Sequence, residues 1–194
     1  MPSHHDSIWV ILAGGRATRM GGHDKGLVKL NGQPLIDYVY DNLNNQNASI
    51  AVNANRNKDF YATYGTVFSD VIEGFPGPLG GIHAAMKNLP NDWLGFVPCD
   101  CPNLPIDLVE KMEAAITPET EILVAHDGDH VQPVVTMMHR GIFDRLDAFL
   151  NAGERKIVLL YDRCNTQYVH FDGQESAFVN LNSPEELEKF GQLS

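Results

Sequence analysis

The sequence predicts an α/β fold: a single three-layer, Rossmann-like domain with a mostly parallel sheet and a less regular antiparallel portion in the C-terminal half. Three observations predict it. The chain has 194 residues, 43% hydrophobic and 20% charged, which suits one globular domain with a sizeable core. Apolar runs alternate with segments of helical periodicity, as in parallel strands joined by helices. No linker, repeat or low-complexity tract divides the chain.

The first half begins with a continuous apolar run, IWVILA at residues 8–13, which predicts a buried strand. Residues 34–45 repeat apolar side chains at helical spacing behind Pro34, so they predict a helix. The same reasoning predicts further strands at 49–55, 66–70 and 93–100, and further helices at 57–65, 82–89 and 105–116.

The second half is less regular. Residues 121–139 predict two strands joined across Asp127-Gly128-Asp129, because Asp-Gly between apolar runs is a strong turn signal. The remaining predictions are a helix at 141–153, a helix or a strand at 156–161, strands at 166–171 and 177–181, and a helix at 183–187. The last helix carries Ser183 three residues before Glu186, which is a capping-box pattern.

The charge of the chain is uneven. Its formal net charge is -11, from 25 acidic against 14 basic residues, which makes it a poor candidate for binding nucleic acid. Residues 8–30, however, hold four basic side chains and one acid, Asp24. A local positive site in an acidic protein favours a small anionic ligand over a polymer.

Cysteine usage and hydropathy bear on the compartment. The three cysteines, Cys99, Cys101 and Cys164, do not form a C-x-x-C pair, and we interpret them as reduced packing residues. The apolar run at 8–13 is too short for a signal peptide, and no segment approaches the length of a membrane span. We therefore expect a cytoplasmic protein that does not bind membranes.

A glycine-rich loop, LAGGRATRMGGHDKG at residues 12–26, follows the first predicted strand. Ligands of α/β sheets bind outside the carboxyl ends of the strands. Glycines let backbone N–H groups approach an anion, and Arg16, Arg19 and Lys25 can contact phosphate oxygens. The loop fits neither G-x-x-x-x-G-K-[ST] nor G-x-G-x-x-G. A structural loop remains the alternative.

Polar side chains also end later strand runs. Asp100 should face the same crevice, where a carboxylate beside a phosphate loop is a natural Mg²⁺ ligand. Asn53 and Asp70 end the second and third runs. Asp70 could accept the adjacent N–H donors of guanine. A structural turn acid is the alternative.

Other candidates are weaker. FPGPLGG at 75–81 precedes a predicted helix, and Gly80-Gly81 either bring the backbone close to a ligand or form a plain turn. We expect His83 to be a packing residue. Asn180 and Asn182 could bind a polar ligand or cap the turn before Ser183. The Asp127-Gly128-Asp129 stretch could hold a metal, but a hairpin turn explains it better. The chain lacks G-x-S-x-G and H-E-x-x-H, so triad hydrolases and zinc peptidases lose support.

The segment LAGGRATRMGGHDKGLVKLNGQPL resembles the L-A-G-G-x-x-x-R-M-G…D-K signature of the α/β nucleotidyltransferases. With VNANR (52–56), PGPLGG (76–81), PCDCP (98–102) and FVNLNSPEEL (178–187), the chain is similar over nearly its whole length to the molybdenum cofactor guanylyltransferases. The resemblance implies transfer of GMP from GTP to the terminal phosphate of molybdopterin, which usually carries molybdenum, with release of pyrophosphate. It implies one domain over 1–194, with nucleotide binding at about 8–116 and acceptor binding at about 117–190.

The resemblance also implies roles for single residues. The nucleotide-binding set is Leu12, Ala13, Gly14, Gly15, Gly22, Lys25, Asn53, Asp70 and Asp100. The catalytic set is Arg19, Lys25 and Asp100, with Asp100 as the Mg²⁺ ligand. The acceptor-binding set is Gly77, Gly81, Asn180 and Asn182. Implied partners are GTP, molybdopterin, and cofactor-synthesis and target-enzyme chaperone proteins. Two positions depart from the family pattern: Cys101 stands where Thr is common, and Thr18 replaces a frequently basic residue.

Two other functions stay open on the sequence alone. One is a nucleotidyltransferase that acts on a sugar or polyol phosphate, which tests with different nucleotides and acceptors would separate. The other is a non-catalytic nucleotide-binding or carrier protein of the same pathway. The acid at Asp100 and the basic loop argue against it.

Overall fold

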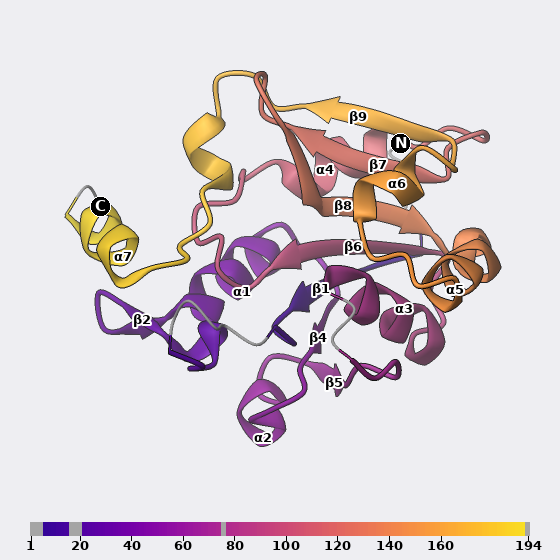
Figure 1. Cartoon of the computed structure of the whole chain (residues 1–194). Helices are drawn as coiled ribbons and strands as arrows, with labels where there is room; N and C mark the ends of the chain where they lie inside the picture. Colours follow the sequence, from indigo (N-terminus) through magenta and orange to yellow (C-terminus); the bar gives the residue numbers. More distant parts are fainter. Residues whose placement is uncertain (1–5, 16–20, 75–76, 193–194) are drawn as a thin grey trace.

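The computed structural model describes residues 6–15, 21–74 and 77–192. In these parts of the chain, seven strands form one sheet in the order β5-β4-β1-β6-β8-β7-β9 (Figure 1). The strands are β1 (Ser7–Leu12), β4 (Ile50–Asn53), β5 (Thr66–Phe68), β6 (Trp93–Pro98), β7 (Ile122–His126), β8 (Val131–His139) and β9 (Thr166–His170).

The sheet is mixed and mostly parallel. β1 pairs in parallel with β4 and β6, β4 with β5, and β7 with β9, while β8 runs antiparallel between β6 and β7. The predicted fold class is therefore confirmed, including the antiparallel portion in the C-terminal half. Since all strands except β8 run the same way, their carboxyl ends share one edge of the sheet, where ligands of such sheets bind.

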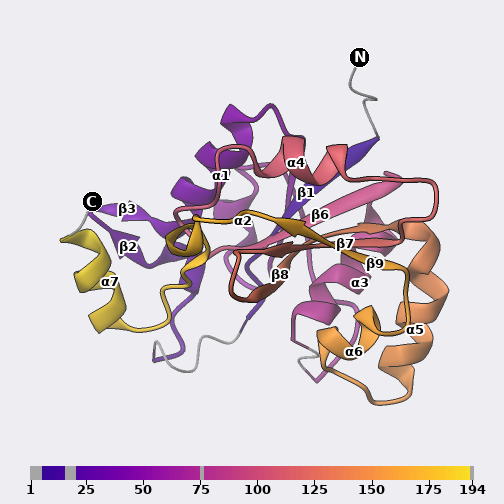
Figure 2. The same cartoon turned by 90° about the horizontal axis from the view of Figure 1, so that it is seen from above.

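Helices cover both faces of this sheet. Figure 2 shows α1 (Leu35–Asn45) and α4 (Leu108–Ala114) on one side, and α3 (Pro78–Asn88), α5 (Phe143–Asn151) and α6 (Ile157–Tyr161) on the other. Alternation along β1 divides the core accordingly. Trp9 and Ile11 pack into one cluster with α1 and α4, and Val10 packs into the other with α3, α5 and α6. This is the predicted three-layer arrangement.

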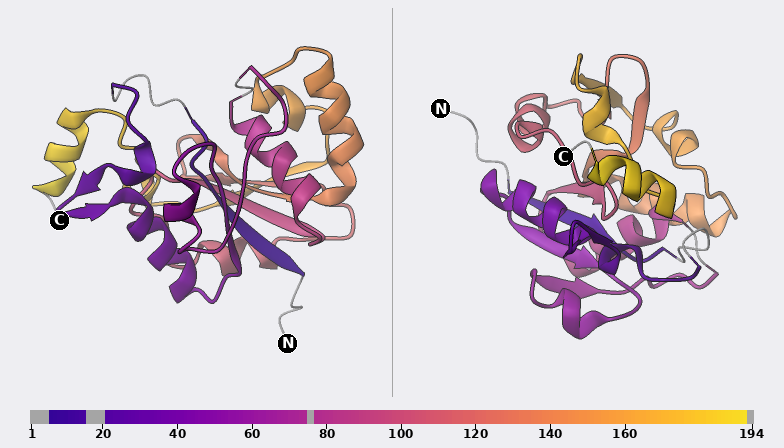
Figure 3. Two further views of the ribbon diagram at one scale, coloured as in Figure 1. Left: turned by 90° about the horizontal axis from the view of Figure 1, so that it is seen from below. Right: turned by 90° about the vertical axis from the view of Figure 1, so that its left-hand side faces the viewer.

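A small unit extends beside the main sheet. The strands β2 (Lys29–Leu30) and β3 (Gln33–Pro34) form a hairpin, and α7 (Pro184–Gly191) lies against it (Figure 3). Leu30, Leu35 and Leu181 form its buried core. The predicted capping box is confirmed: the Ser183 hydroxyl accepts from the Glu186 N–H, and the Glu186 carboxylate accepts from the Ser183 N–H. The end of the chain is thereby held next to the segment that follows the glycine-rich loop.

Three predicted elements differ from the structure. Residues 177–181 are not a strand: a 3₁₀ turn, η4 (Glu175–Phe178), precedes an irregular stretch. Phe178 and Leu181 pack into two different clusters, so this apolar run follows the core without pairing to a strand. The helix predicted at 57–65 is only α2 (Lys58–Tyr61), and the helix predicted at 82–89 begins earlier, at Pro78. Residues 156–161, where both states stayed open, contain the helix α6.

Several smaller predictions are confirmed. Asp127 closes the hairpin between β7 and β8 by accepting from the N–H groups of Asp129 and His130, at 2.9 and 2.7 Å. His83 is buried in α3, where it stacks on Phe143 and hydrogen-bonds Asp147 at 2.8 Å. Cys99 and Cys101 are buried and free, and Cys164 is half-buried and free. A separate observation concerns hydropathy: among the described residues, no helix is long and apolar enough to cross a membrane.

Candidate active site

A cavity of about 480 Å³ opens at the carboxyl edge of the sheet. Its walls come from the ends of β1, β4 and β6, the N-terminus of α3, β8, and the segment before α7. The lining residues are Leu12, Ala13, Gly14, Gly15, Lys25, Asn53, Asp70, Gly77, Pro78, Pro98, Cys99, Asp100, Val134, Asn180 and Asn182.

The structure brings together most of the site residues that the sequence predicts. Those that it describes all line the cavity, except Gly22 and Gly81. Arg19, a predicted catalytic residue, lies outside the described residues, as does Arg16. Two sets that the resemblance assigned to different substrates, the nucleotide and the acceptor, therefore share one cavity.

Lys25 and Asp100 form the charged centre of the cavity. The Lys25 Nζ donates to Asp100 Oδ2 at 2.8 Å and to Asn182 Oδ1 at 2.5 Å. Asp100 is 4% exposed, because it follows the buried central strand β6. The Leu181 N–H donates to the Asp100 carbonyl at 2.9 Å, which holds Asn182 near the pair. Three distant stretches of chain thus meet at one ammonium group.

A second polar group lies at the ends of β4 and β5. Asp70 accepts from the side-chain amides of Asn53 and Asn55, at 2.9 and 3.1 Å. The Asn55 amide also donates to the Gly14 carbonyl at 3.0 Å, so it ties the start of the glycine-rich loop to Asp70. A carboxylate has about four acceptor positions, so Asp70 keeps capacity for a ligand's N–H groups.

The glycines near α3 act in two ways. Gly77, at the N-cap of α3, has φ 67°, a conformation that favours glycine, and it lies in the cavity wall. Gly80 and Gly81 lie inside α3 and are buried, not in the expected turn before the helix. A Cβ on Gly81 would lie 2.4 Å from Asn53 Oδ1 and 2.8 Å from Leu12 Cδ2. Gly81 therefore lets α3 approach β1 and β4 and keeps Asn53 in place.

The donor set fits a magnesium ion that is shared with a substrate. Within the described residues, no group of three or more His, Cys, Asp or Glu side chains could hold a metal by itself. Mg²⁺ is usually bound through one or two carboxylates together with substrate phosphates and water. The buried Asp100 carboxylate in the cavity suits that mode, and its Oδ2 is neutralised by Lys25.

Sequence reasoning missed four lining residues and one contact residue. Pro78, Pro98, Cys99 and Val134 line the cavity. Val134 carried no signal, because it lies in an apolar strand. Asn55 stands in the VNANR stretch (52–56), between Asn53 and Arg56, but no strand-end argument singled it out. Its role appears only when the loop and β5 are brought together.

Comparisons with known proteins identify the family to which the chain belongs. A family model described as the MobA-like NTP transferase domain matches residues 9–165. A protein of Photobacterium profundum, named molybdenum cofactor guanylyltransferase, is 59% identical over 192 residues, which covers 99% of each chain. A protein of the same name from Vibrio vulnificus is 60% identical over 185 residues, 95% of each chain.

Two solved structures share the fold. Molybdopterin-guanine dinucleotide biosynthesis protein A from Archaeoglobus fulgidus has a TM-score of 0.76 at 22% identity and covers 96% of this chain and 97% of its own. A CMP:2-keto-3-deoxy-manno-octonic acid synthetase in complex with CTP has a TM-score of 0.74 at 12% identity, covering 97% and 98%. At these identities the two structures support the fold alone. The family model and the two close relatives go further: the chain belongs to the MobA-like NTP transferase family, among the molybdenum cofactor guanylyltransferases.

Proposed function

We propose that the chain makes the molybdopterin guanine dinucleotide cofactor by transferring GMP from GTP to the terminal phosphate of molybdopterin, with release of pyrophosphate. The two close relatives carry the name molybdenum cofactor guanylyltransferase. The observation that supports the chemistry best is the contact of Lys25 with Asp100 in a cavity that Asn53 and Asp70 also line.

The reaction is an in-line displacement at the α-phosphorus of GTP. An oxygen of the molybdopterin phosphate forms a bond to that phosphorus, and the bond to the bridging oxygen breaks, so that pyrophosphate leaves. The attacking phosphate is already anionic and needs no strong base. The protein must instead bring two polyanions together and stabilise the leaving charge, which is work for positioning and electrostatics.

Lys25 and Asp100 divide this work. Lys25 is one-quarter exposed, so its ammonium can turn from Asp100 to a bound phosphate. Asp100, released from Lys25, would hold Mg²⁺ together with phosphate oxygens. The ion, when bound, neutralises charge on the phosphates. Arg19, whose position lies outside the described residues, is proposed to contact the same phosphates.

The base and the acceptor occupy opposite parts of the cavity in this proposal. Asp70, held by Asn53 and Asn55, accepts from the N–H groups of guanine. Gly77, Asn180 and Asn182 lie toward the molybdopterin side. The division into a nucleotide-binding part at about 8–116 and an acceptor-binding part at about 117–190 is part of the proposal. So are a cytoplasmic location and hand-over of the cofactor by partner proteins.

Pyrophosphate release in the presence of GTP, Mg²⁺ and molybdopterin tests the function. We expect release that depends on all three and that stops when EDTA removes the metal. ATP, CTP and UTP in place of GTP, and sugar or polyol phosphates in place of molybdopterin, serve as controls. Release with another nucleotide and acceptor would identify a different nucleotidyltransferase, and GTP binding without release would indicate a carrier.

A further inference from the structure

The segment after β4 contacts the glycine-rich loop at several points. The Arg56 guanidinium donates to the Gly22 carbonyl at 2.8 Å and to the Gly15 carbonyl at 3.4 Å. The neighbouring Asn55 amide donates to the Gly14 carbonyl at 3.0 Å. Residues near the start of the loop and near its end are therefore hydrogen-bonded to the same short stretch, Asn55-Arg56, which continues into α2.

α2 reaches the loop at Asp24, the residue before Lys25. Asp24 is 8% exposed, and both of its carboxylate oxygens are occupied. The fully buried Tyr61 donates its hydroxyl to Oδ1 at 2.5 Å, and the Asn57 amide donates to Oδ2 at 2.9 Å. A buried carboxylate is costly without such donors, so this arrangement fixes Asp24 firmly.

Tyr61 also contacts the residue after Lys25. A Cβ added to Gly26 would lie 2.4 Å from the Tyr61 hydroxyl oxygen and 3.1 Å from two ring carbons. The backbone of the 3₁₀ turn η2 (Lys25–Leu27) therefore lies directly on the Tyr61 side chain. Tyr61 thus holds the chain on both sides of Lys25.

We propose that Tyr61, Asp24 and Asn57 act as positioning residues that fix the backbone of Lys25, so that its ammonium group can turn from Asp100 to the phosphates of bound GTP. This inference rests on the proposed function, because it concerns the same lysine. A lysine has a long, flexible side chain, so its electrostatic effect depends on a fixed point of attachment. None of the three residues lines the cavity, so in this proposal they affect the substrate only through Lys25.

Burial supports the part that Tyr61 plays. Burial, followed by the hydrogen bond to Asp24, raises the pKa of the Tyr61 hydroxyl far above its ordinary value. With its pKa raised, the phenol stays protonated even in alkaline solution, so it remains a donor to Asp24.

The test is a double-mutant cycle. Tyr61→Phe removes one oxygen atom, and we expect it to lower kcat/KM for GTP by about tenfold or more, since hydrogen bonds to charged groups are among the stronger ones. In a Lys25→Ala background, the same substitution should change the remaining activity by less than about twofold. If Tyr61 acts only by positioning Lys25, its substitution has little effect once Lys25 is gone. A general loss of structure would instead lower the activity with and without Lys25.

Tyr64→Phe is the matched control. Tyr64 follows α2 and donates its hydroxyl to Asp37, away from the loop. The Tyr64→Phe substitution should leave kcat/KM for GTP unchanged even if it lowers the melting temperature. An equal loss from Tyr64→Phe, or an equal effect of Tyr61→Phe with and without Lys25, would overturn the inference.

A second variant covers a failure of Tyr61→Phe to fold. Asn57 is exposed and has φ 49°, so Asn57→Gly removes the amide donor while it keeps the backbone conformation. The same cycle applies to it. Calorimetry of GTP binding to all variants gives a second readout that does not depend on turnover. Absence of GMP transfer by the wild type would contradict the proposed function. Additive losses of GTP affinity in the double variants would contradict the positioning role.

Discussion

Lys25 is the residue on which the candidate site converges, since its ammonium group contacts Asp100 and Asn182 at once. Loss of one preorganised electrostatic group costs on the order of 10²–10³ in rate. We expect Lys25→Ala and Asp100→Ala each to lower kcat for GMP transfer by at least that order while the circular dichroism spectrum is retained. Steady-state pyrophosphate release measures the effect.

Exposed residues of the same type provide the controls for this prediction. Lys87 lies at the end of α3 and Asp144 at the start of α5, both on the surface. Their alanine variants should keep wild-type rates. Near-wild-type turnover of Lys25→Ala or Asp100→Ala would remove that residue from the catalytic set.

Asp70 is predicted to read the guanine base. Asp70→Asn keeps the shape of the side chain but replaces an acceptor by a donor, which then faces the base or the donor amide of Asn53 or Asn55. We expect the ratio of kcat/KM for GTP over ATP to fall about tenfold, since a bidentate contact to a base is worth about 1–3 kcal/mol. An unchanged ratio would exclude Asp70 from base recognition.

The sequence predicted which residues line the cavity better than it predicted their contacts. Asp100 and Asp70 were predicted there because each follows an apolar strand run, and strand ends share an edge. The bond from Lys25 to Asn182 joins residues 157 positions apart and carries no local signal. The contact between Asp24 and Tyr61 could not be predicted from the sequence either, because the burial of both residues follows from the packing of α2.

At the level of elements, α3 depends on a glycine where it crosses β4. Alanine is ordinarily favoured over glycine in a helix by about 1 kcal/mol, so Gly81→Ala should stabilise an unconstrained helix. Here the new Cβ would lie 2.4 Å from Asn53 Oδ1, and overpacking of this kind costs about 1–3 kcal/mol. We expect a lower free energy of unfolding in urea and a raised KM for GTP. A more stable variant with an unchanged KM would contradict this role of Gly81.

Periodicity predicted most elements because buried faces repeat regularly. It failed where apolar residues serve different clusters, as Phe178 and Leu181 do in the stretch read as a strand. It also placed the start of α3 too late. The helix begins at Pro78. Its first turn buries Gly80 and Gly81, which have no large apolar side chain and so do not contribute to a helical pattern of apolar residues.

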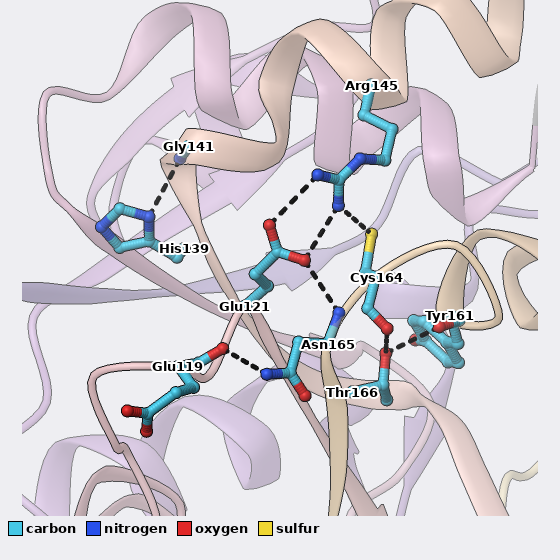
Figure 4. A network of polar contacts seen from close by, with 9 residues as sticks. All are labelled: Glu119, Glu121, His139, Gly141, Arg145, Tyr161, Cys164, Asn165 and Thr166. Atoms are coloured by element: carbon cyan, nitrogen blue, oxygen red, sulfur yellow. Dashed lines mark hydrogen bonds and ion pairs between the residues drawn. The ribbon is translucent and has the colours of Figure 1, made fainter.

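At the scale of the whole molecule, the two edges of the sheet differ in what their polar groups do. The carboxyl edge holds the cavity, while the opposite edge holds a network that ties α5 to the starts of β7 and β9 (Figure 4). Arg145 of α5 donates to both Glu121 oxygens, at 2.9 and 3.2 Å, and to Cys164 Sγ at 3.1 Å. The Asn165 N–H donates to Glu121 at 2.8 Å. Stability and catalysis should therefore be separable.

Glu121→Gln tests that separation. Hydrogen bonds from Arg145, then from the Asn165 N–H, hold the pKa of Glu121 below its ordinary 4.5. A carboxyl whose folded-state pKa is lowered stabilises the fold above its unfolded pKa, and that contribution is lost as the pH falls through the folded value. We expect Glu121→Gln to lose about 1 kcal/mol or less at neutral pH, since the pair is partly exposed, and the difference from wild type to shrink as the pH drops below 4.5. GMP transfer per folded molecule should not change.

Glu119→Gln is the control, because Glu119 contacts Asn165 only through its backbone carbonyl. Urea unfolding of the three proteins across this pH range measures the effect, and a stability difference that persists unchanged in acid would show that the Glu121 charge is not its source.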